Sequence, residues 1–182
     1  MSYDQLTELD DMMSSSDSYL AAQAARSPLT SVRTALDLAS SETRPAVLKA
    51  LAERPGLTTK ALRALLSAEP PAEVACLALR GYKGHKALRE AARSPNRFIR
   101  REVAAHPNTE DYILRELSYD NFVDTRLAIA GRKEIPVGIQ RILARDPAAE
   151  VRRGLAGHEE LFSSARETLE EDPDPRVREL LR

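Results

Sequence analysis

The sequence repeats itself every 26 residues over its C-terminal half, and this periodicity limits the fold more than any other feature. Four columns, in which one kind of residue returns at this spacing, carry the signal: arginine (Arg100, Arg126, Arg152, Arg178), a helix-capping residue (Ser94, Asp120, Asp146, Asp172), leucine (Leu117, Leu143, Leu169) and alanine (Ala52, Ala78, Ala104, Ala130, Ala156). A unit this short cannot bury its own apolar residues. Neighbouring copies must therefore stack.

Each repeat is predicted to contain two short helices. One example is Thr109 to Leu117, in which Ile113 and Leu114 stand at helical spacing with Leu117. After a break at 118–121, a second helix is predicted from Val123 to Ala130. Alanine and leucine, both strong helix formers, exceed a quarter of the chain. The pattern therefore predicts an all-α chain of helix pairs.

The N-terminal part follows the repeat less strictly. Residues 19–93 show spacings of 25 and 27 as well as 26, and they lack the Val-Arg pair that occurs at 151–152 and 177–178. We therefore interpret them as divergent repeats before the regular repeats of 94–182. Residues 1–18 hold five acids and no Lys or Arg. We expect an acidic tail or frayed helix there, leading into a capping helix that starts near Asp17 and ends at Ala25.

The pattern Asp-Pro-x-x-x-Val-Arg-x-x-Leu-Ala, found at 146–156, resembles HEAT-like repeats, and in unit length it is similar to the leucine-rich repeat variant family. The resemblance implies a right-handed α-solenoid of about six short helix pairs, with 19–182 as a single domain. Some members of the variant family bind an iron–sulfur centre through several cysteines. This chain has only Cys76, so no cofactor is expected. The resemblance implies no activity, because such folds serve many functions.

Charge is distributed unevenly, although the net charge is only -1. Residues 80–101 hold eight Lys or Arg and one acid, whereas 159–174 hold seven acids and one Arg. No apolar run is long enough to cross a bilayer, and the acidic N-terminus does not resemble a secretory signal. These features predict a cytoplasmic protein without membrane contact, and they leave nucleic-acid binding open.

Residue types that commonly catalyse reactions have structural interpretations here. His106 and His158 share a column with arginines, so we interpret them as cations at helix ends. His85 has no carboxylate close in sequence, and Cys76 falls on an apolar helix as a small buried residue. No metal-binding or nucleophilic motif is present, so the sequence predicts no enzyme, and catalysis is only a third hypothesis.

Two arginine columns have different expected functions. The first is predicted to form a structural ladder with the capping aspartates, and a row of phosphate contacts is the alternative. This ladder comprises Arg100, Arg126, Arg152, Arg178, Asp120, Asp146 and Asp172. The second column, with flanking cations, is a candidate binding stripe on the first helix of each pair. The stripe comprises Arg63, Lys86, Arg89, Arg93, Arg115 and Arg141.

The second helices offer another surface, a candidate groove at Arg101, Leu127 and Arg153, whose mixed character suits a peptide. The leading hypothesis is a non-enzymatic repeat scaffold that binds a protein or peptide partner. The alternative is a HEAT-like solenoid that binds DNA through the arginine stripe. Self-association through the C-terminal repeat is also expected, because terminal repeats expose apolar surface.

Overall fold

The computed structural model describes residues 3–27, 44–54, 58–67, 72–80, 82 and 84–181. Within these ranges the regular elements are all α-helices, as the sequence predicts. None of the helices in the described ranges is long and apolar enough to span a membrane. The helices are α1 (Tyr3–Ser14), α2 (Ser18–Arg26), α4 (Pro45–Ala52), α5 (Thr59–Ser67), α6 (Ala72–Arg80), α7 (His85–Ala91), α8 (Arg97–Ala105), α9 (Asp111–Leu117), α10 (Val123–Ala130), α11 (Val137–Leu143), α12 (Ala149–Ala156), α13 (Ser163–Glu170) and α14 (Pro175–Glu179).

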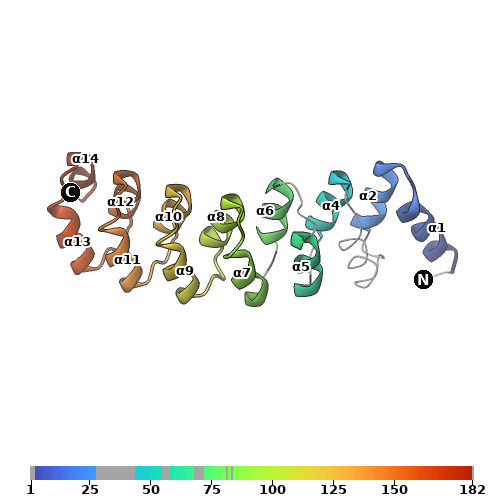
Figure 1. Cartoon of the computed structure of the whole chain (residues 1–182), viewed down its shortest axis with the longest axis horizontal. Helices are drawn as coiled ribbons and strands as arrows, with labels where there is room; N and C mark the ends of the chain where they lie inside the picture. The colour runs from blue at the N-terminus through green and yellow to red at the C-terminus, as the bar shows by residue number, and fades with distance from the viewer. Residues whose placement is uncertain are drawn as a thin grey trace. The chain divides into compact units, whose positions relative to one another are not determined.

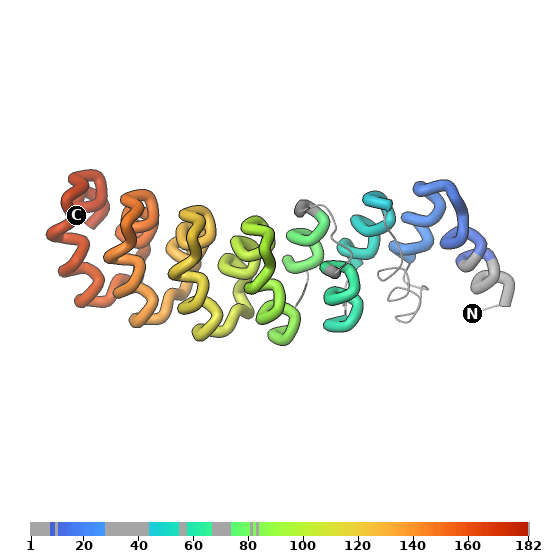
Figure 2. The backbone as a smooth tube through the Cα atoms, in the orientation of Figure 1, coloured from blue at the N-terminus to red at the C-terminus, as the bar shows by residue number. Residues whose placement is uncertain are grey.

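The chain forms two compact units, Met1–Leu88 and Arg89–Arg182. In the first unit α2 packs against α1 and α4, and α4 packs against α6, with α5 in contact with both α4 and α6 (Figures 1 and 2). The acidic N-terminal segment forms helix α1, and Asp17 caps α2 by accepting a hydrogen bond from Tyr19 N. Cys76 of α6 is partly exposed, so the expectation of a buried thiol is wrong.

The second unit has two rows of helices (Figure 1). One row contains α8, α10, α12 and α14, each packed on the next, and the other contains α9, α11 and α13. The helices of the first row begin at 97, 123, 149 and 175, and those of the second at 111, 137 and 163, so equivalent helices start 26 residues apart.

The core of the second unit lies between these two rows. Val103, Ile129 and Leu155, at one position of successive first-row helices, are completely buried. Leucines of the other row are buried as well: Leu117, Leu143 and Leu169. Side chains of α10 pack closely against α12 at Gly154, where an added Cβ would lie 2.9 Å from Leu127 Cδ1. A glycine therefore allows the close contact between these two helices.

The capping column differs from the sequence interpretation. Asp120, Asp146 and Asp172 were expected as N-caps, but the residues at the N-cap positions are Phe122, Ala148 and Asp174, two residues later. Each aspartate instead accepts the backbone N–H of the residue two positions on, at 2.8 to 2.9 Å, which is an Asx turn before the helix. The carboxylate remains able to bind a second donor.

Candidate functional site

Arginine and aspartate side chains that stand 20 residues apart pair in the second unit. Arg126 Nε donates to Asp146 Oδ2 at 2.6 Å, and Arg126 Nη2 donates to Asp146 Oδ1 at 2.9 Å. Two further pairs have the same two-bond geometry: Arg100 with Asp120 and Arg152 with Asp172. Such bidentate pairs are the strongest class of side-chain hydrogen bond.

Each arginine of the ladder also holds the loop before its own helix. Arg126 Nη1 donates to Asp120 O at 2.6 Å, and Arg152 Nη1 donates to Asp146 O at 2.8 Å. Arg178 donates to Asp172 O. The guanidinium groups of Arg100, Arg126 and Arg152 are therefore occupied by protein oxygens and are poor candidates for ligand binding. Arg178 is exposed, and in the described structure its guanidinium bonds to this carbonyl group, so the ion-pair ladder ends at Arg152 and Asp172.

Pairing changes the titration of the ladder. The hydrogen bond from Arg152 holds the pKa of Asp172 below its ordinary value against the opposing effect of burial. Burial alone raises the pKa of Asp120, but hydrogen bonds from Arg100 and Phe122 N outweigh it, so this pKa also lies below its ordinary value. Both carboxylates are therefore charged at neutral pH.

Side chains at the ends of the first-row helices reach back to the end of the preceding helix of that row. Arg132 Nη1 donates to Ala104 O at 2.8 Å and to His106 O at 2.7 Å, both at the end of α8. His158 Nε2 lies 3.0 Å from Arg132 O, while its Nδ1 accepts from Glu160 N at 3.1 Å. These contacts place the Nε2 proton between carbonyl groups. The histidine thus takes part in backbone capping.

Gln140 stands 26 residues after Leu114 and has a structural use that the sequence did not indicate. The side chain is 1% exposed, and its Nε2 donates to Ile135 O at 3.0 Å and to Glu160 O at 2.9 Å. Its Oε1 accepts from Phe162 N at 3.0 Å. The amide therefore joins the loop before α11 to the loop before α13.

The candidate binding stripe divides between the two units. Arg63 and Lys86 belong to the first unit and are exposed; the other four members belong to the second. Arg89 Nε donates to Tyr112 OH at 2.5 Å, and its guanidinium lies 4.0 Å from Glu110. Arg93 lies 3.7 Å from Glu116.

Arg115 and Arg141, the remaining stripe members, line an open groove between α9 and α11. We call this space, of about 1110 Å³, the α9–α11 groove. Arg145, which only flanks the stripe in sequence, lines it as well. Among the residues that the structure describes, no hydrogen bond or ion pair occupies these three guanidinium groups. They are available to a ligand.

The groove combines positive charge with apolar and aromatic surface. Pro136, Ile139 and Ile142 supply apolar lining, and Tyr112 and Tyr119 contribute rings that are 46% and 66% exposed. Sequence reasoning did not single out these tyrosines, because the two positions do not repeat as aromatic residues. Asp111 adds one exposed acid.

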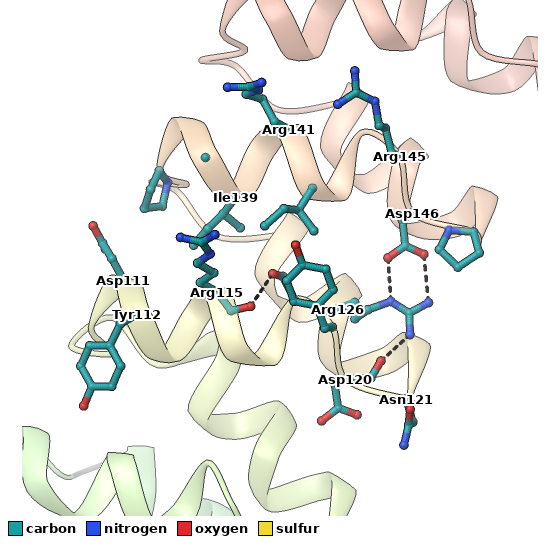
Figure 3. Close-up of a pocket in the computed structure, with 16 residues that line it drawn as sticks. Asp111, Tyr112, Arg115, Asp120, Asn121, Arg126, Ile139, Arg141, Arg145 and Asp146 are labelled. Atoms are coloured by element: carbon teal, nitrogen blue, oxygen red, sulfur yellow. Dashed lines mark hydrogen bonds and ion pairs between the residues drawn. The ribbon is translucent and has the colours of Figure 1, made fainter.

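Charge in the groove forms a strip across α11. Figure 3 shows Arg115 extending from α9 toward α11, while Arg141 of α11 and Arg145, in the turn after α11, project away from α9. The three guanidinium groups thus do not converge on one point. This arrangement suits an extended anionic chain better than a single phosphate ion.

The second-helix candidate groove is a less open surface. Arg101 is exposed on α8, Leu127 is 37% exposed on α10, and Arg153 is half-buried on α12. The Leu127 side chain packs against Gly154 of α12, so part of the apolar surface of Leu127 is covered by that helix. The three residues therefore present a mixed helix surface.

No metal centre is evident in the described ranges, where no three His, Cys, Asp or Glu side chains gather in a suitable group.

Comparisons of the chain with protein-family models, with curated proteins and with solved structures found no match.

Proposed function

We propose that the chain is a non-enzymatic binding module whose α9–α11 groove takes an acidic peptide segment of a protein partner. The observation that carries this proposal is the presence of Arg115, Arg141 and Arg145 beside apolar lining, with no protein carboxylate of the described residues bound to them. Unpaired arginines beside aromatic surface are typical of the centres of protein interfaces.

The scaffold of this module is, in our proposal, a right-handed α-solenoid of the HEAT-like or leucine-rich repeat variant type. The equal spacing of helix starts and the pairing of Arg126 with Asp146 across neighbouring repeats support it. Stacked repeats give long surfaces on which an extended chain can lie. The groove between two successive helices of one row is such a surface.

A peptide suits the groove better than a nucleic acid. Arg89 and Arg93 of the candidate stripe are already engaged with Glu110, Tyr112 and Glu116, which reduces the number of cations left for phosphates. Nucleic-acid affinity depends mainly on the number of phosphates neutralised. Carboxylates spaced along a peptide, with apolar residues between them, match a lining of arginine, isoleucine and proline.

The proposal is tested by fluorescence anisotropy with a labelled peptide of about 10 residues that alternates glutamate and leucine, long enough to span the roughly 10 Å between neighbouring helices. We expect saturable binding that weakens between about 50 and 500 mM salt, because exposed charges are screened over a few ångströms at high salt. A peptide with glutamine in place of glutamate is the matched control.

Two variants locate the binding. Arg115→Glu should abolish it, whereas Arg101→Glu, with the same charge change on α8, should leave it intact. Equal loss in both variants would contradict a specific groove. A single-stranded oligonucleotide that binds more tightly than the peptide would favour the nucleic-acid alternative.

A further inference from the structure

The charge of one helix surface reverses between α11 and α13. Arg141 is the fifth residue of α11 and Glu167 is the fifth residue of α13. Arg145 and Glu171 likewise stand at equivalent places, each eight residues after the first residue of its helix. All four side chains are exposed. Two neighbouring helices, each with the turn that follows it, thus present the same two positions with opposite charge.

Neither set of charges is neutralised by a side chain of the residues that the structure describes. Across the described residues, Arg141, Arg145, Glu167 and Glu171 take part in no ion pair or side-chain hydrogen bond. The ladder carboxylates of Asp146 and Asp172, by contrast, are fully used. Unpaired charges of both signs, side by side at matched levels, make a surface that is complementary to itself.

We propose that two copies of this chain form a symmetric dimer through the exposed side of α11 and α13. The two-fold axis lies in the interface between the two copies. It runs parallel to α11 and α13, midway between them and in front of their exposed side, so α11 of one copy faces α13 of the other. Rotation about such an axis keeps each residue at its own level along the helix. Arg141 then faces Glu167 of the second copy, and Arg145 faces Glu171 of the second copy, each pair occurring twice.

This geometry meets the requirement of a closed symmetric interface, in which residue i of one copy contacts residue j of the other and the reverse. The helices that carry the charges pack side by side in the chain, so their spacing is the same in both copies. The fit depends on the register of two helices and of the turn residues, Arg145 and Glu171, that follow them.

The dimer shares Arg141 and Arg145 with the α9–α11 groove, so a bound peptide and the second copy compete. It does not depend on peptide binding. Arg115 of α9 has no acidic counterpart under this symmetry, because α13 is the last helix of its row in the described chain. Arg115→Glu therefore tests the groove alone, and the oligomeric state measured without peptide tests the dimer alone.

The dimer is tested by charge reversal in the full chain, with mass measured by sedimentation equilibrium. An all-acidic variant carries Arg141→Glu and Arg145→Glu, and an all-basic variant carries Glu167→Arg and Glu171→Arg. We expect the unmodified chain to dimerise with an affinity that falls at least about tenfold from 50 to 500 mM salt. Each variant alone should be monomeric, because like charges then face each other.

An equimolar mixture of the two variants is the decisive arm. All pairs become complementary again between one acidic and one basic copy, so we expect the mixture to dimerise. Arg101→Glu with Arg176→Glu reverses two exposed charges on α8 and α14 and should leave the dimer unchanged. The proposal is overturned if the unmodified chain stays monomeric at low salt, if either variant alone still dimerises, or if the mixture of folded variants stays monomeric.

Discussion

Arg126 and Asp146 form a bidentate ion pair in which the side chains are only 9% and 2% exposed. The pair joins helix α10 to the loop before α12, which belongs to the next repeat. A buried pair adds little net stability compared with apolar residues, but removing one partner is costly because the other charge stays buried. The ladder therefore fixes which loop lies against which helix.

Arg100→Ala should lower the free energy of unfolding by about 3 kcal/mol, because it leaves Asp120, which is 5% exposed, without its cation. Arg152→Ala should lower it in the same way through Asp172. Urea unfolding followed by circular dichroism measures both. The neighbouring Arg101→Ala removes the same side chain from an exposed place on α8 and should change stability by less than about 0.5 kcal/mol. Equal effects at 100 and 101 would argue against a stabilising ladder.

Two buried threonines should respond to valine in opposite directions. Thr125 is completely buried and its Oγ1 has no hydrogen-bond partner in the described structure, so Thr125→Val should raise the free energy of unfolding by about 1 kcal/mol. Ile99, Val151 and Val177 occupy the equivalent positions. Thr109 Oγ1 donates to Val103 O at 2.6 Å, so Thr109→Val should lower stability by about 1 kcal/mol. Thermal unfolding of both variants tests the pair, and destabilisation by Thr125→Val would contradict the assignment.

Acid should weaken the ladder. The pKa of Asp172 is lower in the folded chain than its unfolded value of about 3.9, so its contribution is fully present above that value. The contribution is lost as the pH falls through the lower folded pKa. Asp172→Asn keeps an oxygen that can accept from Asp174 N but removes the charge. The stability difference between the two proteins, measured by urea unfolding from pH 7 to about pH 3, should therefore shrink with falling pH; a constant difference would contradict the assignment.

Two helical glycines provide a test of packing. Gly138 on α11 has open space where a Cβ would lie, so Gly138→Ala should raise stability by about 0.5 kcal/mol through helix propensity. At Gly154 an added Cβ would lie 2.9 Å from Leu127 Cδ1 and 3.2 Å from Ala130 Cβ. Gly154→Ala should therefore lower the melting temperature, because the cost of overpacking exceeds the gain in propensity. Stabilisation by both variants would show that α10 and α12 are less closely packed.

Helices were the most predictable part of the fold. The sequence predicts a helix from Val123 to Ala130, and α10 has these bounds. Apolar spacing and alanine content identify such segments without tertiary information. Asp120 was less predictable, because an aspartate before a helix can either cap it or form an Asx turn two residues earlier. The second carboxylate oxygen of Asp120 binds Arg100, and only the folded position of that arginine determines this.

The α9–α11 groove could be predicted only in part. Arg115 and Arg141 stand out because they share a column, but nothing local shows that Arg89 of this column is engaged with Tyr112. Which cations remain available depends on side chains from the next helix, about 23 residues away in the chain. The use of Gln140 could not be predicted from local sequence either, because its three backbone partners lie in two different loops.

The location of peptide binding is tested most directly by nuclear magnetic resonance of the isotope-labelled chain during titration with the glutamate–leucine peptide. We predict that the amide signals which shift belong to α9, α11 and their flanking loops, within 111–121 and 136–147, with Arg115 and Arg141 among them. Signals of α13 shift as well only where the peptide displaces the second copy of the dimer. Shifts confined to α8, α10 and α12 around Arg101, Leu127 and Arg153 would contradict the proposed groove. Absence of any shift at saturating peptide would contradict the proposed function itself.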